Sequence, residues 1–399
     1  MYPDRLIPLL DAYHTGWSLP QGFYTDQAVF DLEWQHIWRK YWLFAGTTAE
    51  IPRPGDYITR QYHQDSVIII RGDQGEVWAH HNSCRHRGSL ICLEARGHAS
   101  KLLCPYHQWA YNRDGSLYKA RLMPESFDKS SHGLHPVSVR EVGGLIFISL
   151  ADEPPDFEPV AADYAPLMRP FALDTAKVAF QTTYSLRTNW KLVAENFREC
   201  YHCGPAHPEY CSAVIGANLR ESAAETLAER RVAWAAKGLS IRDVDFVGES
   251  FHFAVRYPLR PGVKSYSTDG AAVSMPMGLH QDHDAGVLGL VVLPGFWMDA
   301  VSDYVWTMRV TPAAADRTDI ELTWLVDGRA VAGEDYTTER LVEFWKITGE
   351  QDWALCENNF RGVESSRYVP GPYAPDESEV VRFVDWYIRR MEAGVRVSV

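Results

Sequence analysis

The stretch HNSCRHRGSLICLEARGHASKLLCPYHQW (residues 81–109) decides the fold of the first part of this chain. It contains Cys84-x-His86, seventeen further residues, and then Cys104-x-x-His107. Two cysteines and two histidines can bind zinc, but zinc fingers usually pair Cys with Cys and His with His within each half-site. Here each half offers one thiolate and one imidazole, which suits a [2Fe–2S] cluster whose irons take two Cys and two His respectively. The spacing therefore predicts such a cluster on these four residues, with zinc as the alternative.

The sequence on either side of this stretch predicts a small antiparallel β domain. Gly88 and Pro105 are turn residues, so each half-site is expected at the tip of a β-hairpin. Ser89 and Tyr106 stand where respiratory Rieske proteins carry two further cysteines, so no disulfide is expected between the two loops. Short β-rich runs separated by turn signals flank the loops, at residues 66–71, 77–81, 117–118 and 144–150.

A second group of metal-binding residue types lies in NWKLVAENFRECYHCGPAHPEY (residues 189–210). The sequence predicts a helix from residue 190 that ends at the Gly-Pro pair 204–205, with Asn189 as its cap. Glu195, Glu199 and His202 then share one helical face, and His207 can fold back beyond the break. Two imidazoles and a carboxylate are the ligands of a 2-His-1-carboxylate iron(II) site.

The third iron ligand is expected in TGEQDWALCENNFRG (residues 348–362). Thr348 and Gln351 predict a capping box that places Asp352 in the first turn of a helix. Glu350 and Glu357 are chemically equivalent competitors, and sequence spacing does not decide among the three. Two weaker candidates are a redox role for the two cysteines at 200 and 203 and a metal site in the loop 280–284.

The rest of the chain predicts an α+β protein. An amphipathic helix with an aromatic face is expected at 23–46 and a proline-rich linker at 152–170. We predict an N-terminal helical segment at 1–45 that packs on the catalytic domain, a [2Fe–2S] domain at 46–155 and the catalytic domain at 156–399. Within the last, strands are expected at 178–186, 251–258, 286–296, 304–311 and 319–326, and helices at 338–347, 350–360 and 377–391.

Composition narrows the possible partners and location. The chain has 399 residues, of which 39 are basic and 52 acidic, for a net charge of −13. An acidic chain gains nothing from counterion release on a phosphate backbone, so we expect no nucleic-acid partner. The first residues lack a secretory pattern and no apolar run is long enough for a bilayer span, so we expect no membrane and a cytoplasmic location. Seven cysteines fit a reducing compartment, with thiols used as ligands.

The fragments CRHRGS, CPYHQWAY, NWKLVAENFRECYHC and GVESSRYVPGPY carry a family resemblance. The chain resembles the α subunits of Rieske non-haem iron ring-hydroxylating oxygenases over nearly its whole length, and within them the branch of glycine betaine and stachydrine demethylases. The resemblance implies a helix-grip catalytic domain, in which an antiparallel sheet wraps a long C-terminal helix. It places the mononuclear iron on His202, His207 and Asp352. It also implies a head-to-tail homotrimer in which Glu199 bridges a cluster histidine and an iron histidine of adjacent subunits.

The function implied by this resemblance is the oxidative N-demethylation or hydroxylation of a quaternary ammonium or betaine substrate. Dioxygen is consumed, and NAD(P)H supplies electrons through a separate flavin and iron–sulfur reductase. Aromatic faces are expected to hold the cation, although the sequence does not say which. Phe197 and Phe360 depart from the pattern of the branch and are expected to make the pocket more apolar. The alternatives are an aromatic-ring dioxygenase or O-demethylase with the same metals, and an electron carrier that lacks oxygen chemistry.

Overall fold

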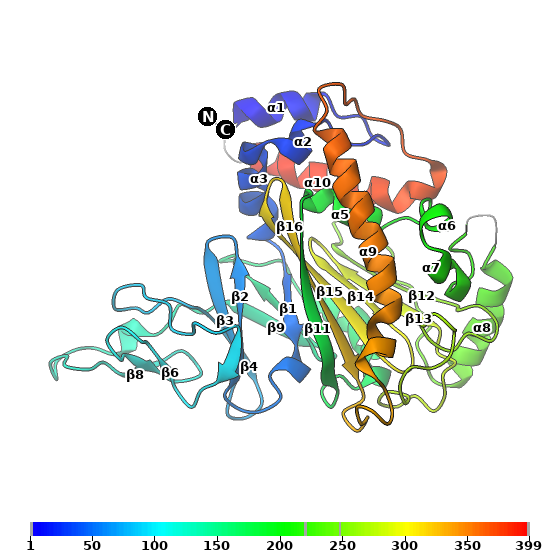
Figure 1. Ribbon diagram of the computed structural model, residues 1–399. Helices are drawn as coiled ribbons and strands as arrows, with labels where there is room; N and C mark the ends of the chain where they lie inside the picture. Colours follow the sequence, from blue (N-terminus) through cyan, green and yellow to red (C-terminus); the bar gives the residue numbers. More distant parts are fainter. Residues whose placement is uncertain (1–2, 219–221, 247–248, 397–399) are drawn as a thin grey trace.

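Two lobes make up the computed structural model, which describes residues 3–218, 222–246 and 249–396 (Figure 1). The smaller lobe, on the left in Figure 1, has two antiparallel sheets and its own apolar core around Ile68 and Ile70. One sheet has the order β4-β3-β2-β5 and the other the order β6-β7-β8. The strands are β2 (Asp56–Tyr62), β3 (Asp65–Arg71), β4 (Val77–His81), β5 (Arg96–His98), β6 (Leu102–Leu103), β7 (Ala110–Tyr111) and β8 (Leu117–Lys119).

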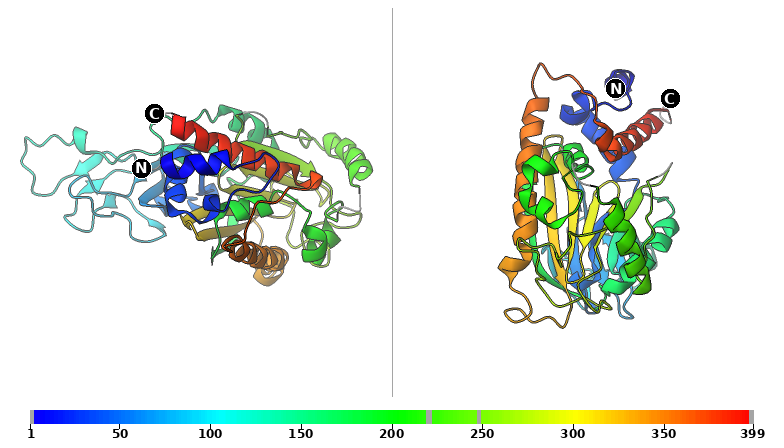
Figure 2. Two further views of the ribbon diagram at one scale, coloured as in Figure 1. Left: turned by 90° about the horizontal axis from the view of Figure 1, so that it is seen from above. Right: turned by 90° about the vertical axis from the view of Figure 1, so that its right-hand side faces the viewer.

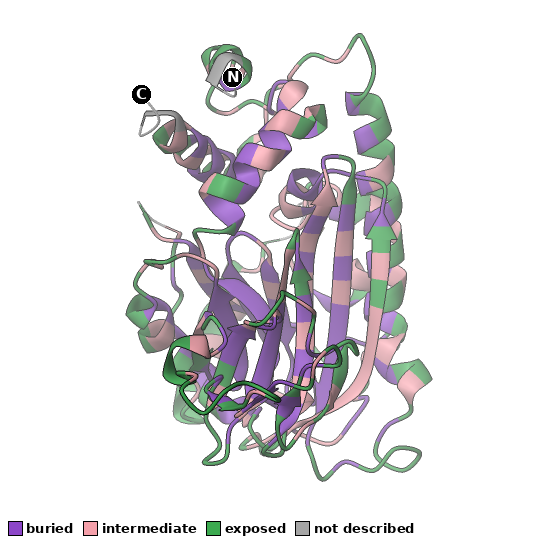
Figure 3. Cartoon of the chain, turned by 90° about the vertical axis from the view of Figure 1, so that its left-hand side faces the viewer, coloured by how far each residue is buried: buried purple, intermediate pink, exposed green. Residues whose placement is uncertain are grey.

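The larger lobe is built on a six-stranded antiparallel sheet of order β11-β16-β15-β14-β13-β12. Its central strands are buried along their length, whereas the outer face of the long helix α9 (Thr338–Val363) is exposed (Figure 3). This helix lies along one face of the sheet, as a helix-grip fold requires (Figure 1). The strands are β11 (Lys177–Leu186), β12 (His252–Tyr257), β13 (Val287–Val292), β14 (Phe296–Ala300), β15 (Val305–Ala314) and β16 (Arg317–Val326).

A third sheet, of order β1-β10-β9, joins the core of the larger lobe. Phe44 and Phe147 pack their rings on Phe296, with centroids 4.5 and 5.3 Å away. The strands are β1 (Leu43–Thr47), β9 (Ser138–Val142) and β10 (Leu145–Ser149). The remaining helices are α1 (Pro3–Asp11), α2 (Gly22–Thr25), α3 (Gln27–Glu33), η1 (Trp34–Trp38), η2 (Thr48–Glu50), η3 (Ser130–His132), α4 (Glu158–Met168), η4 (Arg169–Phe171), α5 (Trp190–Asn196), α6 (Cys203–Ala206), α7 (Pro208–Ala213), α8 (Ala224–Ala236), η5 (Pro375–Glu377) and α10 (Ser378–Arg396).

The N-terminal helices lie beside α10 at one end of the larger sheet (Figure 2). A fully buried carboxylate joins these elements: Glu33 accepts hydrogen bonds from Trp190 Nε1 (2.7 Å), Lys191 Nζ (2.5 Å) and Tyr387 OH (2.6 Å). Burying such a charge is costly unless it is paired and hydrogen-bonded, and here every partner is present. The network therefore fixes the two ends of the described chain to helix α5, which leads into the candidate iron site.

The α+β fold class is confirmed, while several predicted elements are wrong in extent. The helix expected at 23–46 is three short helical segments followed by β1, and the linker expected at 152–170 contains helix α4. That helix forms because Tyr164 is buried and its hydroxyl donates to Val291 O at 2.6 Å. The strand expected at 286–296 is a hairpin of β13 and β14, and the helices at 338–347 and 350–360 are one continuous helix, α9. The domain boundaries at residues 45 and 155 stay a prediction.

Within the described ranges, no helix is both long and apolar enough to cross a membrane.

Candidate metal centres

The two loops predicted to hold the [2Fe–2S] cluster have matching backbone conformations. Cys84 N donates to Ser89 O, and Cys104 N donates to Trp109 O, in each case five residues ahead. Gly88 N and Gln108 N donate back to the carbonyls of Cys84 and Cys104. Gly88 and Gln108 both have positive φ, 78° and 62°, and each lies four residues after its cysteine. The loops are therefore two copies of one turn, each presenting one cysteine and one histidine.

The four side chains of these loops are arranged as a [2Fe–2S] cluster needs. Cys84 and Cys104 are buried, and their thiols are close enough that Cys104 adds to the effect of burial in raising the pKa of Cys84. Tyr111 OH lies 3.2 Å from Cys84 Sγ. The rings of His86 and His107 lie beside each other outside the thiols, nearly perpendicular, with centroids 4.6 Å apart. Thiols inside and imidazoles at the surface fit a cluster whose histidine-bound iron points outward.

The structure brings His202, His207 and Asp352 to one point. Asp352 Oδ1 lies 3.2 Å from His202 Nε2 and 2.9 Å from His207 Nε2. Metal–ligand bonds of about 2.1 Å at right angles put neighbouring ligand atoms about 3.0 Å apart, so these two distances fit a carboxylate oxygen adjacent to each imidazole nitrogen around one metal ion. In the described part of the chain, this is the one set of three or more His, Cys, Asp or Glu whose ligand atoms converge within 4.8 Å. The triad can therefore hold an iron(II) ion.

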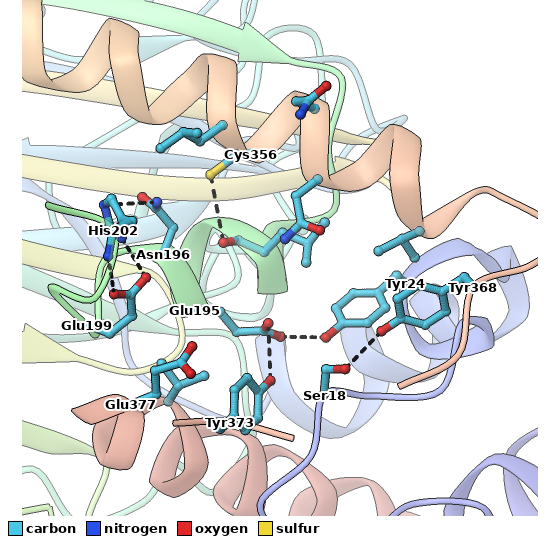
Figure 4. A pocket seen from close by; sticks show the side chains of 16 residues that line it. Ser18, Tyr24, Glu195, Asn196, Glu199, His202, Cys356, Tyr368, Tyr373 and Glu377 are labelled. Atoms are coloured by element: carbon cyan, nitrogen blue, oxygen red, sulfur yellow. Dashed lines mark hydrogen bonds and ion pairs between the residues drawn. The ribbon is translucent and has the colours of Figure 1, made fainter. Parts of the chain in front are cut away.

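Neighbouring polar groups orient both histidines of the triad. Glu199 Oε1 lies 2.5 Å from His202 Nδ1 (Figure 4), and Gln351 Oε1 lies 2.7 Å from His207 Nδ1. Each acceptor fixes the tautomer in which Nδ1 carries the proton and Nε2 is free for a metal. Gln351 and Asp352 are consecutive on α9, so one helix holds both sides of His207.

Electrostatics in the triad favour a cation. Burial disfavours charge on both histidines, but hydrogen bonds to Asp352 and Glu199 outweigh it and raise the pKa of His202 to about 9. Burial alone would raise the pKa of Asp352, yet the two histidines lower it below its usual value, so the carboxylate is ionised. A site that attracts protons in this way also attracts a divalent cation, which displaces them.

The local backbone differs from the predicted helix at 190–203. Helix α5 ends at Asn196, and Cys200 and Cys203, expected inside the helix, are joined by a disulfide beyond its end. Glu199 Oε2 accepts hydrogen bonds from the backbone N–H groups of Tyr201 and His202, and this side-chain capping competes with continued helix.

Because the helix stops, Glu195 does not share a face with the triad. Its carboxylate instead accepts hydrogen bonds from Tyr24 OH (2.8 Å) and Tyr373 OH (3.4 Å), pointing away from Glu199 (Figure 4).

The structure also separates the competitors for the third ligand. Asp352 lies in the middle of α9 rather than in a first turn, on the helix face that is buried. Glu357 accepts from Arg187 N at 2.9 Å and is not in the triad, and neither is Glu350. The loop 280–284 contributes ion pairs to Lys237 instead of a metal site, with Asp282 at 2.9 Å.

A small cavity of about 60 Å³ opens beside the triad. A cavity needs about 10–15 Å³ to hold one water, so this one has room for about four to six water-sized groups. Four aromatic residues line it: Phe197, Tyr210, Trp297 and Trp345. Phe197 thus lies where an apolar pocket was expected, whereas Phe360 is buried in the core and is not among the lining residues. The sequence does not point to the other three rings or to Asp299, because they come from α7, β14 and α9, which only the fold brings together.

These features define the α subunit of a Rieske non-haem iron oxygenase. The sequence matches the Rieske [2Fe-2S] domain over residues 41–133 and the ring hydroxylating alpha subunit (catalytic domain) over residues 173–393. The chain belongs to this family, and it is an oxidoreductase whose cofactors are a Rieske [2Fe–2S] cluster and a mononuclear iron.

Individual relatives agree with this assignment. The chain is 41% identical to the glycine betaine monooxygenase oxygenase subunit of Pseudomonas aeruginosa over 381 residues, covering 94% of this chain and 89% of that protein. It is 36% identical to the carnitine monooxygenase oxygenase subunit of Acinetobacter baumannii over 203 residues, 50% of this chain and 54% of the relative. The crystal structure of the quaternary ammonium Rieske monooxygenase CntA with L-carnitine has the same fold, with a TM-score of 0.70, 24% identity and coverage of 94% and 96%.

Proposed function

We propose that this protein is a monooxygenase that oxidatively N-demethylates, or hydroxylates, a small quaternary ammonium compound of the betaine class. The observation that carries the proposal is the cavity beside the triad, which is small, lined by four aromatic rings and free of lysine and arginine among its lining residues in the described ranges. Aromatic faces attract a methylated ammonium through cation–π interaction. The whole-length similarity to glycine betaine monooxygenase oxygenase subunits supports the same substrate class.

We propose Cys84, His86, Cys104 and His107 as the cluster ligands; the triad His202, His207 and Asp352 would hold the iron. When bound, these groups supply single electrons and activate dioxygen. The protein contributes positioning: Glu199 and Gln351 keep the Nδ1 protons in place, so that both Nε2 atoms point at the metal. The aromatic lining excludes water and orients a C–H bond of the substrate toward the triad.

We further propose that electrons pass between subunits of a head-to-tail homotrimer. The cluster loops follow β4 and β6 in the smaller lobe, whereas the triad adjoins α6, which lies on the far side of the larger lobe in two perpendicular views (Figures 1 and 2). Apolar side chains on and around the cluster loops are exposed, as an interface would need: Leu90, Leu93, Leu103, Tyr106, Tyr118 and Leu122. In such a trimer, Glu199 would bridge His202 and a cluster histidine of the neighbouring subunit.

The electron donor is proposed to be a separate flavin and iron–sulfur reductase that oxidises NAD(P)H. Because NAD(P)H is a cytoplasmic reductant, we propose that the enzyme works in the cytoplasm. The solved structure of a quaternary ammonium Rieske monooxygenase has been described as revealing inter-subunit electron transfer, which supports the same arrangement here. Mass photometry of the purified holoenzyme tests the trimer; a monomer at micromolar concentration would contradict it.

A substrate panel tests the proposed reaction. Glycine betaine, proline betaine, carnitine, choline and aromatic acids are incubated with the enzyme, NADH and a surrogate reductase, and dioxygen uptake and formaldehyde are measured. We expect formaldehyde from a betaine in proportion to dioxygen consumed. His202→Ala is the matched control, because it should keep the visible spectrum of the cluster and lose turnover. Formation of cis-diols from arenes, with no oxidation of any ammonium compound, would establish the aromatic alternative instead.

Metal analysis tests the electron-carrier alternative. We expect three irons and two acid-labile sulfides per chain, because one iron is bound outside the cluster. Two irons and two sulfides would show a Rieske carrier without the second centre.

A further inference from the structure

One wall of the cavity beside the triad contains a buried carboxylate that the proposed mechanism does not use. Asp299 lies on β14 and is 3% exposed. Its Oδ2 accepts a hydrogen bond from Tyr257 OH at 3.1 Å, but its Oδ1 has no hydrogen-bond partner. Among the residues that the structure describes, no lysine, arginine or histidine forms an ion pair with it. Such a group is expensive to bury, which calls for a functional explanation.

The free oxygen of Asp299 is itself buried, and the neighbouring strand sends no polar side chain toward it. Gly289 on β13 pairs directly with Asp299, and a Cβ at this glycine would lie 3.2 Å from Oδ1. Because glycine has no side chain, this position supplies no partner for Oδ1, and Val255 and Tyr257 pack close to it. Asp299 also lines the same cavity as the triad residues His207 and Asp352.

The space around Asp299 has the chemistry of a cation site. Tyr210 lies within electrostatic range of both carboxylates: burial raises the pKa of its phenol, and Asp299 and Asp352 add to this effect. Phe197 and Trp297 line the same space, with ring centroids 5.8 Å apart. A quaternary ammonium group has no N–H to donate, so aromatic faces and an uncompensated negative charge are the groups that can bind it.

We propose that Asp299 is the counter-ion of the substrate's methylated ammonium group and makes the cavity selective for a cation over a neutral group of the same shape. This inference rests on the proposed function and deepens it. The charges around the triad support the counter-ion role of Asp299. Asp352 and Glu199 would offset the positive charge of a bound iron ion, whereas the charge of Asp299 would offset that of the substrate. The cavity is also small, so a trimethylammonium group inside it would lie close to both the rings and the carboxylate.

The test compares a cation with its uncharged isostere. In 3,3-dimethylbutanoate a carbon replaces the nitrogen of glycine betaine, so shape and carboxylate are kept and the positive charge is lost. Affinities of both compounds, and of tetramethylammonium, are measured by isothermal titration calorimetry on the metal-loaded enzyme. Asp299→Asn should lower the affinity for glycine betaine and for tetramethylammonium by about 30-fold or more, as expected when one partner of a buried charge pair is removed. It should change the affinity for 3,3-dimethylbutanoate by less than about threefold.

A matched control is Asp319→Asn, which removes one negative charge from the same sheet at a position bonded to Ser185 and outside the cavity. It should leave all three affinities unchanged. Unchanged cation affinity in Asp299→Asn, in an enzyme that still oxidises glycine betaine, would overturn the counter-ion role and leave the proposed function intact. A wild-type enzyme that neither binds nor oxidises any ammonium compound would overturn both.

A second measurement is the proton release that accompanies binding. Burial raises the pKa of Asp299 to about 7, so the free enzyme is partly protonated there at pH 6.5. The phenols of Tyr210, Tyr257 and Tyr266 that surround it have pKa values raised further above their usual range and stay neutral. Binding of tetramethylammonium should therefore release a proton at pH 6.5 and none at pH 8.5, measured from calorimetry in buffers of different ionisation enthalpy. Proton release at pH 6.5 that persists unchanged in Asp299→Asn would contradict the proposal.

Discussion

Replacing Asp299 by asparagine should stabilise the substrate-free enzyme at alkaline pH. The carboxyl is buried without a counter-ion, and burial raises its pKa from 3.8 to about 7. Between these two values the folded protein keeps a proton that the unfolded chain has lost. The folded state then binds more protons, so the free energy of unfolding falls as pH rises through this window. Asparagine has nearly the same shape and does not ionise, so the free energy of unfolding of the variant lacks this dependence on pH.

The size of the effect follows from the shift in pKa. Each pKa unit corresponds to about 1.36 kcal/mol, so a shift of about three units costs the wild type about 4 kcal/mol above pH 7. Between pH 5.5 and 8, titration of Asp299 should lower the free energy of unfolding of the wild type by about 2 kcal/mol. The asparagine amide brings an unpaired N–H that costs about 1–3 kcal/mol, but this cost does not depend on pH. At about 1.2 °C per kcal/mol for a chain of 399 residues, the melting temperature of the variant should rise relative to wild type by about 2–3 °C between these pH values.

Differential scanning fluorimetry of the metal-loaded wild type, Asp299→Asn and Asp319→Asn at half-unit steps from pH 5.5 to 8 measures this difference. Comparing variant with wild type at each pH cancels the titration of the iron ligands, which are the same in all three proteins. A difference between Asp299→Asn and wild type that stays constant across the range would refute the reasoning, as would an equal rise in Asp319→Asn.

Four further outcomes are expected. Glu33→Ala leaves the ammonium of Lys191 buried and unpaired, and should lower the free energy of unfolding in urea by about 3–5 kcal/mol. His207→Ala should lose about one iron per chain by metal analysis while the visible spectrum of the cluster persists. Cys84→Ser should bleach that spectrum. Glu199→Gln should keep both centres but slow reoxidation of the reduced cluster by about tenfold or more in single-turnover stopped flow; unchanged reoxidation would count against its bridging role.

The cluster loops could be predicted from sequence because all their ligands lie within 24 residues, from Cys84 to His107. Their hairpin geometry depends on local turns such as the one at Gly88, whose positive φ suits glycine. The two histidines of the triad could be predicted for the same reason, because they lie five residues apart.

The third residue of the triad was harder, because Asp352 is far from the histidines in sequence. The capping box expected at Thr348 and Gln351 implied a helix start, but α9 runs through this point, and Gly349 is a packing position at which a Cβ would meet the Trp353 ring at 3.3 Å. With the helix continuous, Asp352 falls on a stripe that is otherwise mostly apolar and buried, together with Trp345 and Cys356. A single carboxylate on an otherwise apolar helix face indicates a functional residue. This pattern is visible in the sequence only when the segment is treated as one continuous helix.

The cavity could not have been predicted from one sequence. Phe197, Trp297 and Trp345 come from a turn, a strand and a helix, and only the tertiary packing brings them together. Asp299 has apolar and aromatic neighbours in sequence, and nothing local distinguishes it from an ordinary strand residue at a sheet edge.

The consecutive positions of Gln351 and Asp352 on α9 limit where residues can be inserted into or deleted from this sequence. A single residue inserted earlier in that helix would rotate both side chains by about 100° around its axis, so His207 would lose its contacts on both ring nitrogens at once. Loops at the sheet edge can grow or shrink without this consequence. Chimeras and deletion libraries should therefore place their junctions outside residues 338–363.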